Sequence, residues 1–136
     1  ASHSRLRAIE MDVQDAPDLF PPLVALCAYC PGTSVLHGVS RLTHKESDRY
    51  ETLRREFGAL GIDIRKEGDA MVVHGGQPGS GTVRSHGDHR IAMALATAAL
   101  GAAGPVTIRD ADCVAKSFPD FFERLTDLGV YVQRLA

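Results

Sequence analysis

The sequence predicts an α/β (α+β) fold that contains two copies of one β-α-β-α-β unit. Strand-like and helix-like segments alternate along the 136 residues, and Gly/Pro-containing stretches separate them. Landmarks also recur at nearly constant spacing, because Asp18 and Asp88 are 70 residues apart and Lys45 and Lys116 are 71 apart. Leu-Gly pairs at 60–61 and 128–129 are 68 apart. This period is too long for a common solenoid repeat and therefore favours a duplicated supersecondary unit.

The first copy is expected at about 6–74, in the order strand, helix, strand, helix and hairpin. In the second helix Leu53, Phe57 and Leu60 recur at helical spacing, and Gly68 marks the hairpin turn. The segments expected to form these elements are 6–13, 17–29, 31–39, 44–60 and 61–76.

The second copy is expected at about 80–134 and repeats this order up to its last strand. Its first helix is rich in alanine, and a Gly-Pro pair precedes its second strand. The segments expected to form its elements are 81–90, which leads into a helix at 91–101, a strand at 104–111, a helix at 113–129 and a strand at 130–135.

Composition limits the possible classes of function. With 44% hydrophobic and 24% charged residues, the chain is long enough to form one compact domain with a core. A formal net charge of −2 excludes the basic character of a general nucleic-acid binder. No segment is long enough to span a bilayer, and residues 1–13 do not resemble a signal peptide, so we expect a cytoplasmic protein without a membrane partner.

Two motifs resemble metal or redox sites, but packing or surface roles are favoured for both. Cys27 and Cys30 have CxxC spacing at the end of an apolar helix, without a second such pair, so we expect them to pack in or near the core. His86 and His89, with His74 as a distant third ligand, match no common zinc pattern, and Arg90 would repel a cation. We therefore expect no metal and no cofactor.

Charged residues gather where helices are expected to start. The clusters are Lys45-Glu46-Ser47-Asp48-Arg49, Asp88-His89-Arg90 and Lys116-Ser117, with Asp18 at a fourth start. In one interpretation Asp18, Asp88 and Ser117 cap helices while the cations are solvated. In the other, cations at corresponding positions of both copies converge at one edge and bind an anion such as a phosphorylated carboxylic acid.

Four motifs resemble the C-terminal region of the 5-enolpyruvylshikimate-3-phosphate synthases. They are DAPDLFPPL at 15–23, KESDR at 45–49, GDHRIAM at 87–93 and AKSFPDFF at 115–122, and the resemblance extends from about Arg7 to Leu128. It implies transfer of the carboxyvinyl group of phosphoenolpyruvate to shikimate 3-phosphate, a step toward aromatic amino acids. The implied fold is an inside-out α/β barrel whose two lobes each contain three β-α-β-α-β-β units, of which this chain would supply two.

The resemblance also implies roles for individual residues. Asp18 would lie beside the attacking hydroxyl, and Glu46 would carry the proton for the methylene carbon of phosphoenolpyruvate. The residues implied to bind substrates are Lys45, Arg49, His89, Arg90 and Lys116. Arg41 departs from the family pattern, because some members carry a neutral side chain there that contacts shikimate 3-phosphate.

Length is the larger departure, because enzymes of this family are much longer. Residues 1–136 are therefore expected to form the C-terminal part of one lobe, to need the N-terminal lobe as a partner, and to be inactive alone. Two alternatives remain open at this point: a relative of the UDP-N-acetylglucosamine 1-carboxyvinyltransferases, and an anion-binding module without catalysis.

Overall fold

The computed structural model describes residues 5–43, 45 and 47–135, and its strands lie in two sheets. The larger sheet has the strand order β1-β2-β4-β3, in which β1 and β2 are parallel and β4 is antiparallel to both of its neighbours. The smaller sheet pairs β5 and β6 in parallel. The strands are β1 (Glu10–Asp12), β2 (Gly32–His37), β3 (Asp63–Glu67), β4 (Ala70–Gly75), β5 (Gly81–Arg84) and β6 (Val106–Arg109).

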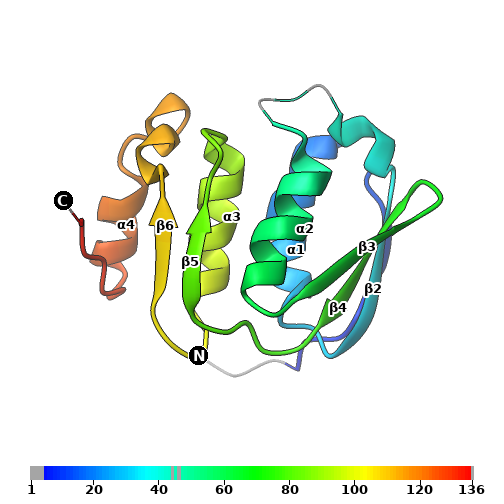
Figure 1. Cartoon of the computed structure of the whole chain (residues 1–136), viewed down its shortest axis with the longest axis horizontal. Coiled ribbons are helices and arrows are strands. Elements are labelled where there is room, and N and C mark those ends of the chain that lie inside the picture. The colour runs from blue at the N-terminus through cyan, green and yellow to red at the C-terminus, as the bar shows by residue number, and fades with distance from the viewer. Residues whose placement is uncertain (1–4, 44, 46, 136) are drawn as a thin grey trace.

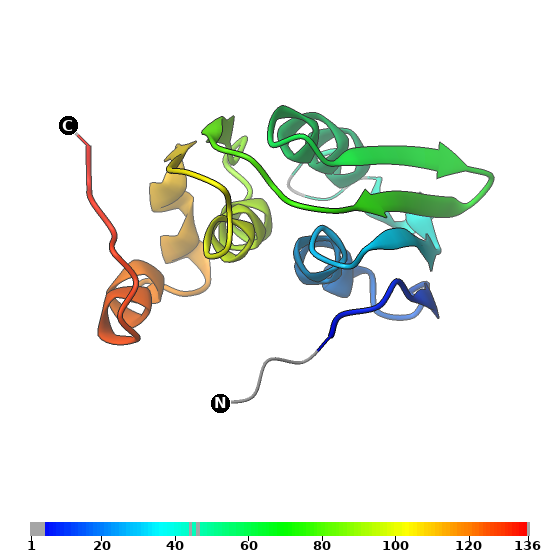
Figure 2. The same ribbon diagram turned by 90° about the horizontal axis from the view of Figure 1, so that it is seen from below.

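Helices fill the space between the two sheets. Figures 1 and 2 show α1, α2 and α3 side by side, with the four-stranded sheet on one side and β5 and β6 on the other. The α-helices are α1 (Phe20–Cys27), α2 (Arg49–Ala59), α3 (His89–Ala99) and α4 (Phe121–Asp127), and the 3₁₀-helices are η1 (Pro17–Leu19), η2 (Val39–Leu42) and η3 (Ala111–Lys116). The predicted mixed α/β fold is confirmed.

The core lies where these helices meet one another and the larger sheet. Phe20 and Val24 of α1, Phe57 of α2 and Leu95 of α3 are fully buried. The buried face of α3 also contains Ala94 and Ala98, whose small side chains let neighbouring helices approach closely. The same core encloses Cys27 and borders Cys30, which confirms the packing role predicted for them.

The two halves of the chain follow a similar order of elements. The first half contains β1, α1, β2, η2 and α2, and the second contains β5, α3, β6, η3 and α4. In each half the first two strands are parallel neighbours connected through a helix. The division into repeat units at about 6–74 and 80–134 stays a prediction, which superposition of the two segments tests.

Two predicted elements in the second half are wrong. The helix expected over 113–129 is interrupted, since η3 ends at Lys116 and α4 begins at Phe121. Pro119 lies in the break, and a proline disfavours helical backbone at the residue before it. The strand expected at 130–135 is absent. Tyr131 there is 87% exposed, and none of the strands that the structure describes pairs with this segment.

Among the residues that the structure describes, no helix is both long and apolar enough to cross a membrane.

Candidate active site

The charged helix starts meet at one edge of the molecule, the upper edge in Figure 1. Asp18 lies in η1 just before α1, Arg49 is the first residue of α2, and Asp88 is the N-cap of α3. Lys116 is the last residue of η3 and approaches the turn before α3. The four residues converge as expected, but Lys116 lies at the end of η3 and not at the helix start that the sequence predicts.

Arg49 joins two of the helix starts through its guanidinium group. Its Nε and Nη2 atoms donate to the two carboxylate oxygens of Asp88, at 2.9 and 3.3 Å, and its Nη1 atom donates to Asp18 at 2.9 Å. Such a fork-to-fork contact fixes the orientation of both partners. Only 1% of the Arg49 side chain is exposed, so the cation expected at the start of α2 lies inside the protein.

Asp88 is fully buried and receives hydrogen bonds from several elements. Besides Arg49, the hydroxyl of Ser47 donates to it at 2.8 Å, and the backbone N–H of Arg90 donates at 3.0 Å as a helix cap. Burial by itself would raise the pKa of Asp88, but the hydrogen bonds from Arg49 and Ser47 hold that pKa below its usual value. The carboxylate is therefore stabilised in its charged form.

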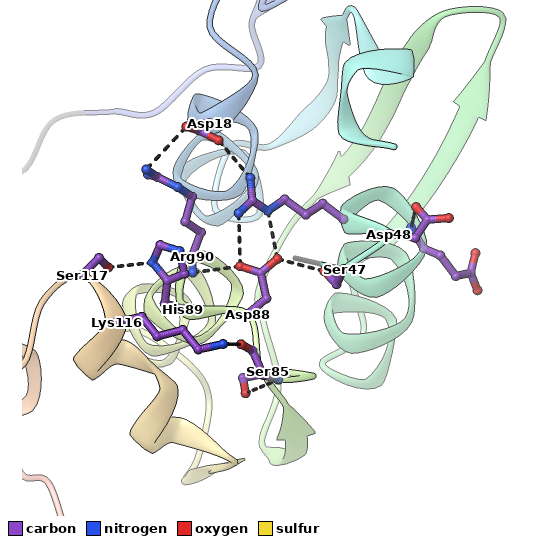
Figure 3. A network of polar contacts seen from close by, with 12 residues as sticks. Asp18, Ser47, Asp48, Ser85, Asp88, His89, Arg90, Lys116 and Ser117 are labelled. Atoms are coloured by element: carbon purple, nitrogen blue, oxygen red, sulfur yellow. Dashed lines mark hydrogen bonds and ion pairs between the residues drawn. The ribbon is translucent and has the colours of Figure 1, made fainter. Parts of the chain in front are cut away.

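Asp18 lies between two arginines, and Figure 3 shows its carboxylate facing Arg90. The Oδ2 atom of Asp18 is 3.4 Å from Nη2 of Arg90, while Oδ1 accepts from Arg49. Half of the Asp18 side chain and 38% of the Arg90 side chain are exposed. Asp18 and Arg90 thus form the part of the network that solvent or a ligand can reach.

Lys116 and His89 line the other side of the network (Figure 3). The ammonium group of Lys116 donates to the backbone carbonyl of Gly87 at 2.8 Å, and Lys116 is exposed. Nδ1 of His89 and the hydroxyl of Ser117 share a 2.6 Å hydrogen bond. The interpretation in which Ser117 caps the start of a helix is wrong, because Ser117 follows η3 and α4 begins later, with Asp120 at its N-cap.

Of the remaining positions that the sequence singles out, Arg41 belongs to η2. Lys45 is half-buried, whereas Glu46 lies outside the described residues. The exposed Arg41 donates from Nη1 to the backbone carbonyl of Gln14 at 2.9 Å. The structure thus brings Asp18, Arg49, His89, Arg90 and Lys116 close to the turn before α3.

The sequence indicates Asp88 only as a helix cap and contains no signal for Ser47, Ser85 or Glu56. In the structure Asp88 is also the central hydrogen-bond acceptor of the site. The sequence does not predict that it is buried, because a helix cap is normally partly exposed. Glu56 and Ser85 are buried polar residues behind the site. Glu56 occurs in an ordinary helical sequence and Ser85 in an ordinary turn sequence, so neither residue stands out before the structure is known.

The described residues do not form a set of metal ligands. Within 5–43, 45 and 47–135, no group of three or more His, Cys, Asp or Glu side chains is arranged to hold an ion. His86 instead contacts Glu56.

Burial raises the pKa of the thiols of Cys27 and Cys30, which makes these cysteines less reactive.

Comparisons with known proteins show which family this chain is similar to. A family model described as EPSP synthase (3-phosphoshikimate 1-carboxyvinyltransferase) matches residues 1–125. Curated proteins named 3-phosphoshikimate 1-carboxyvinyltransferase from Natronomonas pharaonis and Methanothermobacter thermautotrophicus are 44% and 42% identical over 96% and 95% of this chain. The chain spans about 30% of the length of each of these relatives.

Solved structures show the same relationship. An EPSP synthase from Acinetobacter baumannii superposes with a TM-score of 0.78 at 36% identity, covering 85% of this chain and 28% of that protein. The enolpyruvyl transferase NikO from Streptomyces tendae gives a TM-score of 0.74 at 26% identity, covering 97% of this chain and 30% of that protein. The family-model match and these relatives place the chain in the EPSP synthase family.

Proposed function

We propose that this chain contributes one wall of the active site of a 3-phosphoshikimate 1-carboxyvinyltransferase. The reaction joins the 5-hydroxyl of shikimate 3-phosphate to the carboxyvinyl group of phosphoenolpyruvate and releases phosphate. The observation that carries this proposal is the meeting of Asp18, Arg90 and Lys116 at one edge of the helices, in a protein of this family. The N-terminal lobe would supply the opposite wall, and we place the enzyme in the cytoplasm.

The accessible cations suit the anionic donor phosphoenolpyruvate. Arg90 is partly exposed and Lys116 is exposed. A guanidinium and an ammonium group can together hold a phosphate and a carboxylate. Arg49 is bound by Asp88 and Asp18 and only 1% of its side chain is exposed, so its guanidinium group would have to become more accessible to reach the donor. His89 and Lys45 are proposed to contact the substrates from the two flanks of this clamp.

The carboxylates account for the proton transfers. In the addition step the hydroxyl oxygen bonds to C2 of phosphoenolpyruvate, Asp18 takes the hydroxyl proton, and Glu46 delivers a proton to the methylene carbon. In the elimination step the same carbon returns its proton and phosphate leaves. The cations stabilise the negative charge on the departing phosphate.

The 136-residue chain alone should show no measurable turnover. Transition-state stabilisation needs both walls of the site, and this chain spans about 30% of its relatives. Phosphate release in the presence of both substrates is the measurement, with the Acinetobacter baumannii EPSP synthase as positive control. Sustained product formation by the pure chain would contradict the assignment of a single wall.

Arg90→Ala and Lys116→Ala should each raise the KM for phosphoenolpyruvate about ten- to a hundredfold. Each variant removes a charge-assisted hydrogen bond to the donor, which contributes about 1.5–3 kcal/mol. Initial rates are measured in a full-length enzyme that contains this chain, or in a chimaera with the Acinetobacter baumannii protein. Arg55→Ala, which removes an exposed arginine of α2, is the matched control. Equal KM values in all three variants would exclude Arg90 and Lys116 from the clamp.

A further inference from the structure

The turn between β5 and α3 has an unusual backbone. His86 and Gly87 both have positive φ angles, 56° and 71°. Glycine adopts this conformation without strain, whereas another residue there costs about 1–2 kcal/mol. Contacts around His86 must therefore hold the turn in this shape.

Glu56 of α2 supplies such a contact from inside the protein. Its Oε2 atom accepts from Nε2 of His86 at 2.9 Å, and its Oε1 atom accepts from the backbone N–H of Arg84 at 2.8 Å. Only 7% of the Glu56 side chain is exposed. One buried carboxylate thus connects the end of β5 to the strained residue of the turn.

The same face of α2 holds the turn at a second point. Arg49 and Glu56 are seven residues apart, which is about two helical turns, so their side chains leave α2 on one side. Arg49 binds Asp88 at the end of the turn, and Glu56 binds His86 in its middle. The turn is therefore attached to a rigid element at both positions.

On its other side the turn contacts the segment that contains Lys116. The hydroxyl of the buried Ser85 donates to the backbone carbonyl of Asp110 at 2.7 Å and accepts from the N–H of Gly87 at 3.1 Å. Figure 3 shows Ser85 beside Asp88 and Lys116. The carbonyl of Gly87 then accepts from Lys116, so the shape of the turn sets the position of this ammonium group.

We propose that Glu56 and His86 are positioning residues for the anion clamp, an inference that rests on the proposed function. Neither residue is assigned a contact with substrate. Their hydrogen bond keeps the turn in the left-handed conformation that presents the Gly87 carbonyl to Lys116 and starts α3 at His89 and Arg90. Loss of this hydrogen bond displaces Arg90 and Lys116, which form the clamp. It does not remove Asp18 or Glu46, the carboxylates proposed to transfer protons.

Glu56→Ala should raise the KM for phosphoenolpyruvate at least about tenfold in the full-length enzyme while kcat changes less than about threefold, because small displacements of binding groups weaken substrate positioning. Glu56→Gln should restore a KM within about twofold of the unaltered enzyme. Its amide oxygen still accepts from Arg84, and its NH₂ group donates to the other tautomer of His86. Glu51→Ala is the matched control, because Glu51 lies on α2 and its described side-chain partners are the exposed Arg54 and Arg55.

His86→Gly separates positioning from folding. Glycine removes the strain of the positive φ angle, so the variant should unfold at a temperature no lower than that of the unaltered enzyme. It also removes the ring that Glu56 binds, so its KM should rise, but less than in Glu56→Ala, because glycine adopts the left-handed turn without strain. Folded Glu56→Ala and His86→Gly enzymes that both retain the original KM would overturn the proposal.

The proposed function can fail separately. It fails if the unaltered full-length enzyme does not transfer the carboxyvinyl group to shikimate 3-phosphate. Amide exchange in the 136-residue chain then still tests the contact: Glu56→Ala should speed exchange at Arg84 and Gly87 about tenfold or more, with Glu51→Ala unchanged. Unchanged exchange at both amides would overturn the positioning role.

Discussion

Glu46→Gln should lower kcat of the full-length enzyme by roughly two to four orders of magnitude while substrate affinity changes little. Glutamine keeps the size and much of the hydrogen bonding of the side chain but has no titratable proton. Glu46 lies outside the described residues, yet the next residue, Ser47, donates to the central Asp88 carboxylate at 2.8 Å. Ser47 itself is therefore anchored to the site.

Hydrogen exchange gives an independent measurement of the same step. Exchange of the methylene hydrogens of phosphoenolpyruvate with deuterated solvent should slow in parallel with kcat, because both need proton delivery to carbon. Glu51→Gln, in the first turn of α2, is the matched control for a change of helix-start charge. Near-normal turnover and exchange in a folded Glu46→Gln enzyme would leave Asp18 as the leading proton-transfer group.

Arg49→Met should reduce the free energy of unfolding of the 136-residue chain by about 3–5 kcal/mol. The substitution leaves Asp88 as a buried carboxylate without its cationic partner, and neither side chain is more than 1% exposed. Urea denaturation measures the loss. Arg65→Ala, which removes one member of an exposed pair with Asp63, should cost less than about 1 kcal/mol.

A second substitution tests whether the unpaired charge causes the loss. Asp88→Asn in the Arg49→Met background removes the buried charge and keeps a cap for α3, so the double variant should recover at least about 1 kcal/mol. An Arg49→Met chain as stable as the unaltered chain would show that the pair contributes nothing to folding.

Local patterns predicted much of the fold. The amphipathic spacing of Leu53 and Phe57 and the hairpin turn at Gly68 matched α2 and the β3–β4 pair. Prediction failed where a tertiary partner or a single residue decides the outcome. Pro119 interrupts the expected helix, and the segment at 130–135 has no strand to pair with in the described part of the chain.

The candidate site was predictable as a set of residues but not as a network. Charge at the expected helix starts indicated the cations Arg90 and Lys116, because such positions favour anion binding, and it also indicated the acid Asp18. The sequence contains no sign that Arg49 is buried against Asp88, since both residue types are usually exposed. Glu56 is similar, because an acid in the middle of a helix resembles an ordinary surface position until the turn that it binds is known.

The contacts of α2 with the turn before α3 restrict how relatives can be recombined. Arg49 and Asp88 are 39 residues apart in the chain, and Glu56 and His86 are 30 apart, yet each pair shares a buried or partly buried contact. A crossover anywhere between positions 57 and 85 takes the partners of both pairs from different parents. Fragment exchange should therefore succeed most often with boundaries before Ser47 or after His89, so that both pairs are inherited together.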